Sequence, residues 1–123
     1  MAEPKKSVVI FEDNPSIRQL LKFFFLKKGF EPATFEDGLD AVKHVRAHSP
    51  VLITMDLIMP GADGIEAAAD LRREGITTPI LMLTSKDIEQ DRARAKAAGV
   101  DAYLLKPFNP AALEAAILPL LAR

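Results

Sequence analysis

The chain has 123 residues, no cysteine, and a formal net charge of −1 from 16 basic and 17 acidic side chains. Its 49% hydrophobic content suits one domain with a core, disulfide stabilisation is excluded, and broad electrostatic binding to nucleic acid is disfavoured. The polar start is too short for a signal peptide, and the longest apolar run, residues 23–26, is too short to cross a bilayer. We therefore expect a single cytoplasmic domain over residues 1–123, without a membrane span.

Short apolar segments alternate with helical patterns along the whole chain. In chain order we expect a strand at 7–11, a helix between Asn14 and Gly29, a strand at 31–35, a helix at 39–48, a strand at 51–55, a helix between Gly64 and Gly75, a strand at 79–84, a helix at 88–98, a strand at 102–105 and a helix that includes 113–121. This alternation predicts an α/β fold, in which a parallel sheet is covered by helices on both faces.

Two of the predicted helices are unusual. The alanine-rich helix at 88–98 has a thin apolar face, so we expect it to pack weakly, either as a mobile element or because alanine permits close contact with the sheet. Pro119 falls within the apolar pattern of the last helix, which predicts a kink or fraying there unless the terminal turn tolerates proline.

Polar side chains stand where four of the five predicted strands end. Glu12 and Asp13 follow the first strand, Asp56 follows the third, Thr84 closes the fourth and Lys106 follows the fifth. Each has an ordinary explanation when taken alone, as a helix cap, a turn former, a strand residue or a loop residue. In a parallel sheet, however, the carboxyl ends of the strands face one crevice, and we expect these groups to meet there.

The expected group of side chains has a definite chemistry. Close carboxylates repel one another, and a hard divalent cation such as Mg²⁺ removes that repulsion through oxygen ligands. Lys106 adds a positive charge, so an anion that carries oxygen atoms, such as a phosphoryl group, would fit between the two cations. Asp56 could then form an acyl phosphate as a nucleophile, with the Thr84 hydroxyl as a hydrogen-bond donor.

Four segments carry a resemblance to a known family. They are VVIFEDN with Glu12 and Asp13, TMDLIMPGADG around Asp56, LMLTS ending at Thr84 and Ser85, and DAYLLKPF with Lys106. Their order and content, from about residue 6 to 121, closely resemble the receiver domain of two-component response regulators. The resemblance implies a flavodoxin-like (βα)5 fold whose parallel sheet has the strand order 2-1-3-4-5.

The resemblance also implies roles for individual residues. Asp56 would accept a phosphoryl group from a sensor histidine kinase or a histidine phosphotransfer protein. Asp13, Asp56 and the backbone carbonyl of Ile58 would bind Mg²⁺ directly, while Glu12 would act on it through water. The chain would thus be a signalling switch that catalyses its own phosphorylation and dephosphorylation, and not an enzyme acting on other substrates.

Further residues would bind the phosphoryl group or transmit its presence. Lys106, Leu57 and Ser85 would contact phosphoryl oxygens. Thr84 and Tyr103 would move together and alter the surface of the fourth helix, fifth strand and fifth helix. A downstream effector protein, or a second copy in a homodimer, would read that surface, with no direct contact to nucleic acid.

Two residues at the mouth of the expected site vary within the family. Ile58 lies two positions after Asp56 and is apolar, whereas Lys86 lies two positions after Thr84 and is basic. We hypothesise that Ile58 hinders the water that would hydrolyse the acyl phosphate, so that the phosphorylated state persists.

Several alternatives remain open at this point. The chain is either a stand-alone receiver or a receiver from a longer regulator, such as a transcription factor, a cyclase or a hybrid kinase. The acidic loop after the first strand disfavours a flavin carrier, and G-x-G-x-x-G, the motif of a dehydrogenase, is absent there. A small metal-dependent phosphatase would need a general acid beside Asp56 that the sequence does not offer. A receiver that no longer accepts phosphate is disfavoured because all the expected groups are present.

Overall fold

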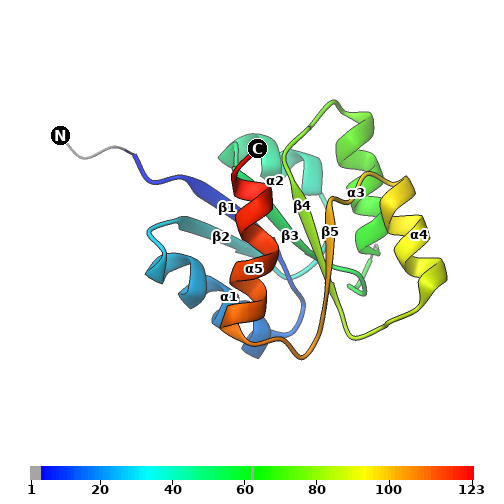
Figure 1. Cartoon of the computed structure of the whole chain (residues 1–123). Helices are drawn as coiled ribbons and strands as arrows, with labels where there is room; N and C mark the ends of the chain where they lie inside the picture. Colours follow the sequence, from blue (N-terminus) through cyan, green and yellow to red (C-terminus); the bar gives the residue numbers. More distant parts are fainter. Residues whose placement is uncertain (1–3, 62) are drawn as a thin grey trace.

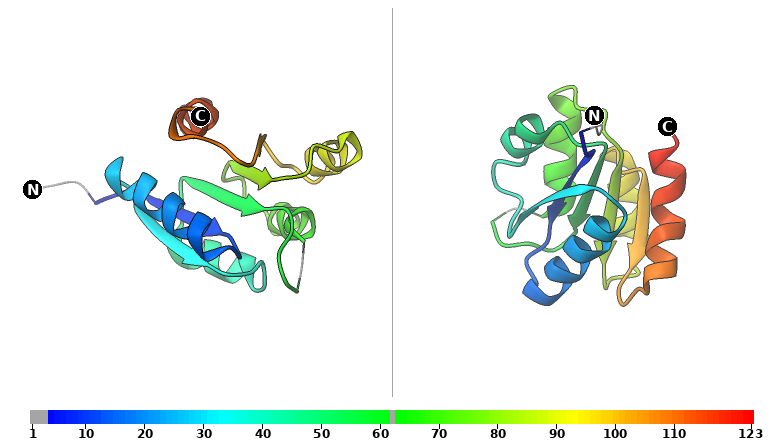
Figure 2. Two further views of the ribbon diagram at one scale, coloured as in Figure 1. Left: turned by 90° about the horizontal axis from the view of Figure 1, so that it is seen from below. Right: turned by 90° about the vertical axis from the view of Figure 1, so that its left-hand side faces the viewer.

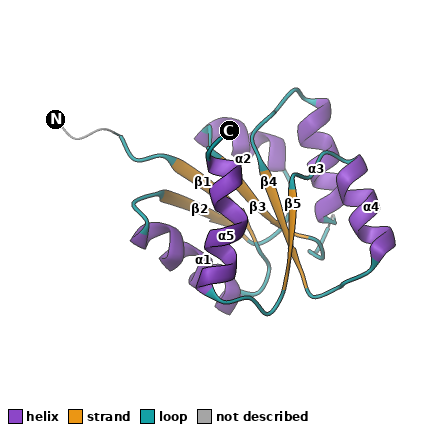
Figure 3. Cartoon of the chain, in the orientation of Figure 1, coloured by secondary structure: helices purple, strands orange, loops and turns teal. Residues whose placement is uncertain are grey.

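The computed structural model describes residues 4–61 and 63–123, in which strands and helices alternate along the chain (Figure 1, Figure 3). The strands are β1 (Ser7–Phe11), β2 (Glu31–Phe35), β3 (Leu52–Asp56), β4 (Ile80–Thr84) and β5 (Ala102–Leu105). The helices are α1 (Pro15–Lys27), α2 (Ala41–His48), α3 (Gly64–Arg73), α4 (Glu89–Ala97) and α5 (Pro110–Leu121). Within the described ranges, no helix combines the length and hydropathy needed to span a bilayer.

The five strands form one parallel sheet in the order β2-β1-β3-β4-β5. This topology confirms the predicted α/β fold and its strand order. In register, Val9 of β1 lies between Ala33 and Ile53, so the carboxyl ends of neighbouring strands lie at the same edge. Every chain segment that leaves this edge is therefore a loop that leads from a strand into the next helix.

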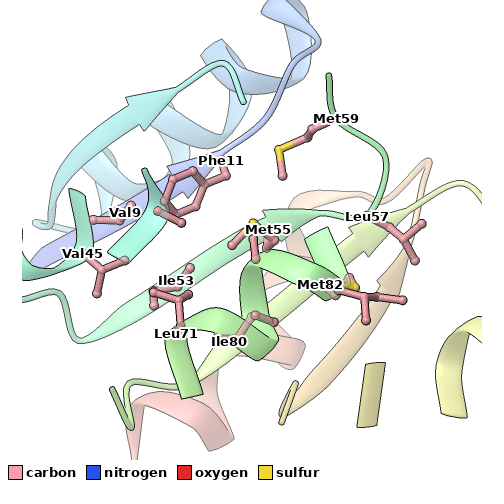
Figure 4. Close-up of a cluster of buried hydrophobic side chains, with 14 of the residues drawn as sticks. Val9, Phe11, Val45, Ile53, Met55, Leu57, Met59, Leu71, Ile80 and Met82 are labelled. Atoms are coloured by element: carbon pink, nitrogen blue, oxygen red, sulfur yellow. The ribbon is translucent and has the colours of Figure 1, made fainter. Parts of the chain in front are cut away.

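Helices cover both faces of the sheet. On one face, side chains of α1 and α5 pack on Val8 and Ile10 of β1. On the other face, α2, α3 and α4 cover a second cluster that includes Val9, Ile53 and Met82 (Figure 4). The right-hand view of Figure 2 shows α5 on one side of the sheet and α2 on the other. Burial on both faces explains why the central strands read as continuous apolar runs in the sequence.

Helix caps place the starts of the helices close to the strand ends. As predicted, Asn14 caps α1, because its Oδ1 accepts hydrogen bonds from the amides of Ser16 (2.9 Å) and Ile17 (3.1 Å). Two further caps were not predicted: Asp63 Oδ1 accepts from Glu66 N at 2.7 Å, and Asn109 Oδ1 caps α5 in the same way.

Several predicted boundaries differ from the structure by one or two residues, and two of these differences have a clear cause. The second helix begins at Ala41 and not at Leu39, because Asp37 Oδ1 holds the amide of Leu39 in a turn and Asp40 takes a left-handed conformation with φ of 56°. Asp56 is the last residue of β3 rather than the first of a loop, since it pairs in register with Leu83 of β4.

The structure bears on both of the unusual helices. Ala95 is the only buried residue of α4, all of which is described, so the thin apolar face is confirmed. The last helix continues past Pro119 to Leu121, and Pro119 therefore lies in its final turn. This agrees with the interpretation that a terminal turn tolerates proline.

An arginine fixes the edge of the sheet opposite to the carboxyl ends. Arg72 at the end of α3 donates to the carbonyls of Ile76 (2.7 Å) and Gly99 (3.0 Å) and to Asp101 Oδ2 (2.9 Å). The same Asp101 oxygen accepts from the amide of Ile80 at the start of β4. These contacts join α3, β4 and the loop before β5, far along the strands from the polar side chains described below.

Gly64, the first residue of α3, lies directly against the end of β3. Its amide donates to Leu57 O at 2.7 Å, and a Cβ atom here would overlap Asp56 O and lie 2.9 Å from Met55 Cγ. Only glycine therefore permits α3 to begin this close to the backbone of Asp56.

We predict that Gly64→Ala lowers the free energy of unfolding by at least about 2 kcal/mol, because backbone must shift to accept the methyl group. Urea denaturation measures this loss. Gly29→Ala is the control: its φ of +88° is unfavourable, but no atom lies within 4 Å of the added Cβ, so the loss should be roughly 1 kcal/mol. Equal losses at the two positions would contradict the close contact at Gly64.

Candidate functional site

The structure brings the predicted strand-end side chains together at the carboxyl edge of the sheet. Glu12 and Asp13 follow β1, Asp56 ends β3, Thr84 ends β4 and Lys106 follows β5. Because β1, β3, β4 and β5 are neighbours in that order, these residues lie in sequence along one edge. The expected crevice is thus a property of the strand order.

Three carboxylates form a compact cluster at this edge. Glu12, Asp13 and Asp56 each contribute one oxygen, and these oxygens all lie within 4.8 Å of one another. Glu12 is fully buried and Asp56 is only 5% exposed, whereas Asp13 is open to solvent. Two buried carboxylates at this separation are unfavourable unless cations compensate their charge.

Lys106 supplies one compensating charge. Its Nζ lies 2.9 Å from Glu12 Oε1 and 3.2 Å from Asp56 Oδ2, and its side chain is only 14% exposed. The ammonium group therefore bridges two of the three acidic residues, in the position that the sequence predicted for it. A single positive charge leaves the cluster with a net negative charge.

The electrostatics of Asp56 reflect this imbalance. Burial is the main cause that raises the pKa of Asp56 to about 7, and hydrogen-bonding contact with Glu12 and Asp13 raises it further, while the Lys106 charge lowers it. A proton is thus held near neutral pH at a position that a cation could occupy instead.

The donor set of the cluster fits a hard divalent cation. Glu12 Oε2 accepts a hydrogen bond from the amide of Asn14 at 3.2 Å. Glu12 Oε1 is buried, and its contact with Lys106 is an ion pair without hydrogen-bond geometry, so no donor among the described residues satisfies it. An unsatisfied buried carboxylate oxygen beside two further carboxylates is the kind of oxygen-rich environment that Mg²⁺ prefers.

The loop after Asp56 directs one amide toward its carboxylate. Ile58 N donates to Asp56 Oδ1 at 3.3 Å, whereas Leu57 N donates to Leu83 O at 3.0 Å. Leu57 is buried, and Ile58 is 48% exposed. In this arrangement the amide that faces the carboxylate is that of Ile58, and the role of Leu57 stays a prediction.

Thr84 and Tyr103 meet at a single residue of the loop between β4 and α4. The buried Thr84 Oγ1 accepts a hydrogen bond from Lys86 N at 3.1 Å, and the Tyr103 hydroxyl donates to Lys86 O at 3.1 Å. Burial raises the pKa of the Tyr103 hydroxyl above its usual range, so it keeps the proton that it donates. Ser85, which lies between Thr84 and Lys86 in the chain, is exposed.

A groove of about 500 Å³ opens beside the carboxylate cluster. One part of its lining is polar and belongs to the site, with Asp13, Asn14, Ser85 and Lys106. The other part is apolar and comes from α1 and the loop before α5, with Ile17, Leu20, Pro107 and Phe108. The groove therefore offers a mixed surface for a second molecule that would approach Asp56.

Sequence reasoning missed one residue that shapes the site. Arg18 of α1 donates from Nη1 to the backbone carbonyls of Glu12 (3.0 Å) and Asp13 (3.3 Å), and its Nη2 lies 3.7 Å from Glu36. The guanidinium group thus binds the backbone of the loop that carries Glu12 and Asp13. In the sequence Arg18 is an ordinary polar position of a helix, and only the fold of the loop between β1 and α1 brings it to these carbonyl groups.

Comparison with known proteins gives consistent similarities. The family model described as "Response regulator receiver domain" matches residues 8–118. The chain is 36% identical over 118 residues to the alkaline phosphatase synthesis transcriptional regulatory protein PhoP of Bacillus subtilis, covering 96% of the chain and 49% of that protein. It is 36% identical over 120 residues to the phosphate regulon transcriptional regulatory protein PhoB of Escherichia coli, covering 96% of the chain and 52% of PhoB. The chain therefore spans about half the length of these relatives.

A solved structure shows the same fold. It is the crystal structure of the receiver domain of a sensor histidine kinase from Pseudomonas aeruginosa, with a magnesium ion coordinated in the active site cleft. The two chains superpose with a TM-score of 0.87 at 27% sequence identity, over 98% of this chain and 100% of the other.

We predict that Asp56→Asn stabilises the protein without Mg²⁺, and that the gain depends on pH. The pKa of Asp56 is about 7 in the folded state and 3.8 in the unfolded state. Between these two pH values the folded state binds more protons than the unfolded state, so the stability of the wild type falls as pH rises from 3.8 to about 7. Above pH 7 the variant should gain roughly 1–3 kcal/mol in unfolding free energy, and the gain should shrink toward the acidic end of the window.

Urea denaturation across this pH range, with a chelator present, measures the effect. Asp70→Asn, at an exposed aspartate of α3, is the control and should change stability little at any pH. Added Mg²⁺ should stabilise the wild type more than Asp56→Asn. A variant that is less stable than the wild type above pH 7 would show that the carboxylate cluster is not unfavourable.

Proposed function

The chain belongs to the response regulator receiver domain family of two-component systems, and from this premise we propose that it is a phosphorylation switch in which Asp56 accepts the phosphoryl group. The observation that carries the proposal is the position of Lys106, whose Nζ lies 3.2 Å from Asp56 Oδ2 and 2.9 Å from Glu12 Oε1. A cation that already bridges the nucleophile and its acidic neighbour can also neutralise an oxygen of an incoming phosphoryl group.

The proposed reaction transfers a phosphoryl group from a phosphohistidine. An oxygen of the Asp56 carboxylate attacks the phosphorus atom, a P–O bond forms, and the P–N bond to the histidine ring breaks. The departing imidazole keeps the electron pair of that bond and takes up a proton. Such transfer depends on positioning and charge neutralisation more than on proton transfer, which suits a site made of carboxylates, an ammonium group and amides. The chain would catalyse this step, and the later hydrolysis, at its own Asp56.

The acidic cluster supports Mg²⁺ as the cofactor of this reaction. Asp13, Asp56 and the carbonyl of Ile58 would bind the ion, and Glu12 would act through water, consistent with its unsatisfied buried oxygen. When bound, Mg²⁺ supplies positive charge that stabilises the phosphoryl oxygens during transfer. Arg18 would keep the loop that carries Glu12 and Asp13 in place through their carbonyl groups.

The remaining residues would bind the phosphoryl group or report its presence. Besides Lys106, we assign phosphoryl contacts to Leu57 and Ser85. The Thr84 hydroxyl would turn toward the phosphoryl group, and Tyr103 would turn inward behind it. Their shared partner Lys86 supports this coupling, because a change at either side chain alters the loop that leads into α4.

The groove beside Asp56 supports a protein as the phosphoryl donor. Its polar part would receive the phosphohistidine, and its apolar part would contact the surrounding surface of a sensor histidine kinase or a histidine phosphotransfer protein. A downstream effector, or a second copy of the chain, would bind the surface formed by α4, β5 and α5. The single domain that we propose spans residues 1–123, of which 1–3 and 62 lie outside the described residues.

The phosphoacceptor role predicts a simple result with a small phosphodonor. Incubation with Mg²⁺ and acetyl phosphate should add one phosphoryl group to the protein, as measured by intact mass. Asp56→Ala should abolish the adduct, while the control Asp70→Ala, at an exposed aspartate of α3, should retain it. An adduct that persists in Asp56→Ala, or a wild type that responds neither to acetyl phosphate nor to beryllofluoride, would overturn the proposal.

We expect the exposed side chain of Ile58 to shield the acyl phosphate from water, which would make the phosphorylated state long-lived. Ile58→Asn should speed dephosphorylation on the order of tenfold, the change produced by about 1.4 kcal/mol in the barrier. The loss of the adduct with time, followed by intact mass after removal of the donor, measures the rate. Leu118→Asn, at an exposed leucine far along α5, is the matched control. Equal rates in the wild type and Ile58→Asn would refute the shielding.

A further inference from the structure

A continuous series of contacts runs from Thr84 to the outer side of Tyr103. Thr84 Oγ1 accepts from Lys86 N, and the Tyr103 hydroxyl donates to Lys86 O, both at 3.1 Å. We call this arrangement, with the Tyr103 hydroxyl on Lys86 O, the outward arrangement. It occupies the loop that joins β4 to α4, so the state of Tyr103 and the position of that loop are linked.

Arg92 of α4 contacts Tyr103 on the outer side of this series. Its guanidinium carbon lies 4.5 Å from the centre of the Tyr103 ring, a distance typical of a cation–π contact. Its Nε donates to Asp87 Oδ1 at 3.0 Å, and Asp87 belongs to the same loop as Lys86. Arg92 therefore contacts both Asp87 in the loop before α4 and the ring of Tyr103 in β5.

The weak packing of α4 makes this contact important. Ala95 is the only side chain of α4, a helix described in full, that is buried in the core. The first turns of the helix are thus attached mainly by polar and cation–π contacts, of which Arg92 makes two. Such contacts are modest in strength, so a change in one of them can shift the balance between two arrangements.

We propose that Arg92 is a positioning residue that stabilises the outward arrangement of Tyr103 and thereby opposes activation of the switch, an inference that rests on the proposed function of Asp56. The contact with the ring exists in the outward arrangement and is lost when Tyr103 turns inward. A contact that one state alone makes stabilises that state, and any ligand that favours the other state binds more weakly as a result. Removal of Arg92 therefore favours the inward state.

The direction in which the affinity for beryllofluoride changes distinguishes this role from a simple electrostatic effect. Loss of a positive charge near the site would weaken binding of an anion such as beryllofluoride, which mimics the phosphoryl group. Loss of the contact that opposes activation would instead strengthen that binding. The two explanations predict opposite shifts for the same substitution.

Tyr103 itself provides the readout, because the chain contains one tyrosine and no tryptophan. Its fluorescence emission reports on this side chain alone, both before and during titration with beryllofluoride in Mg²⁺. Arg92→Gln should change the emission of the unliganded protein and lower the titration midpoint a few-fold. Asp87→Ala, which removes the hydrogen-bond acceptor of Arg92 Nε, should act in the same direction, and Arg92→Lys should restore part of the wild-type behaviour.

Arg94→Gln is the matched control, since Arg94 lies on the same helix and pairs with Asp63 and Asp91 rather than with the tyrosine. It should leave both readouts at their wild-type values. A midpoint for Arg92→Gln that is equal to or higher than that of the wild type would overturn the proposal. If the wild type does not respond to beryllofluoride, the proposed function fails. If the emission of unliganded Arg92→Gln equals that of the wild type, the effect of Arg92 on Tyr103 is refuted independently of the proposed function.

Discussion

The main constraint on this structure is the repulsion among three carboxylates that the fold holds close together at the carboxyl edge of the sheet. Glu12 and Asp56 are buried, Asp13 lies beside them, and the Lys106 ammonium group compensates only part of their charge. The fold holds this unfavourable group together because β1, β3 and β5 carry the residues rigidly to one edge. Burial raises the pKa of Asp56 to about 7, and the neighbouring carboxylates add to this shift. Such a group of carboxylates favours the binding of a further cation.

Rigid contacts surround this site on the side of the sheet core. Gly64 lets α3 begin against the backbone of Asp56, and Arg18 holds the carbonyls of the loop that carries Glu12 and Asp13. At the opposite edge, Arg72 and Asp101 join α3 to the loops around β4 and β5. The contacts of Gly64 and Arg18 fix the backbone that carries the carboxylates, while those of Arg72 and Asp101 fix the far ends of the strands.

The region around α4 differs from the rest of the molecule. This helix buries one side chain, and its first turns are attached through Arg92 and Asp87 to Tyr103 and to the loop that contains Lys86. Because that loop also binds Thr84, it connects the edge of the site to the least firmly packed helix. A weakly attached helix beside a well-packed core is a suitable arrangement for a switch, since such a helix opens at a lower free-energy cost than the sheet.

Local patterns in the sequence were enough to predict the ten elements, the parallel α/β class and the polar residues at the strand ends, because hydrophobic period and turn chemistry depend on near neighbours. The Asn14 cap and the thin apolar face of α4 were predicted for the same reason. The strand order came from the resemblance rather than from the pattern. Only the tertiary structure decided that Lys106 bridges Glu12 as well as Asp56, that Gly64 lies against Asp56, and that Arg92 covers Tyr103. Each of these contacts joins residues from different elements, and their partners are set by the packing of the sheet and helices rather than by the residues around them in the chain.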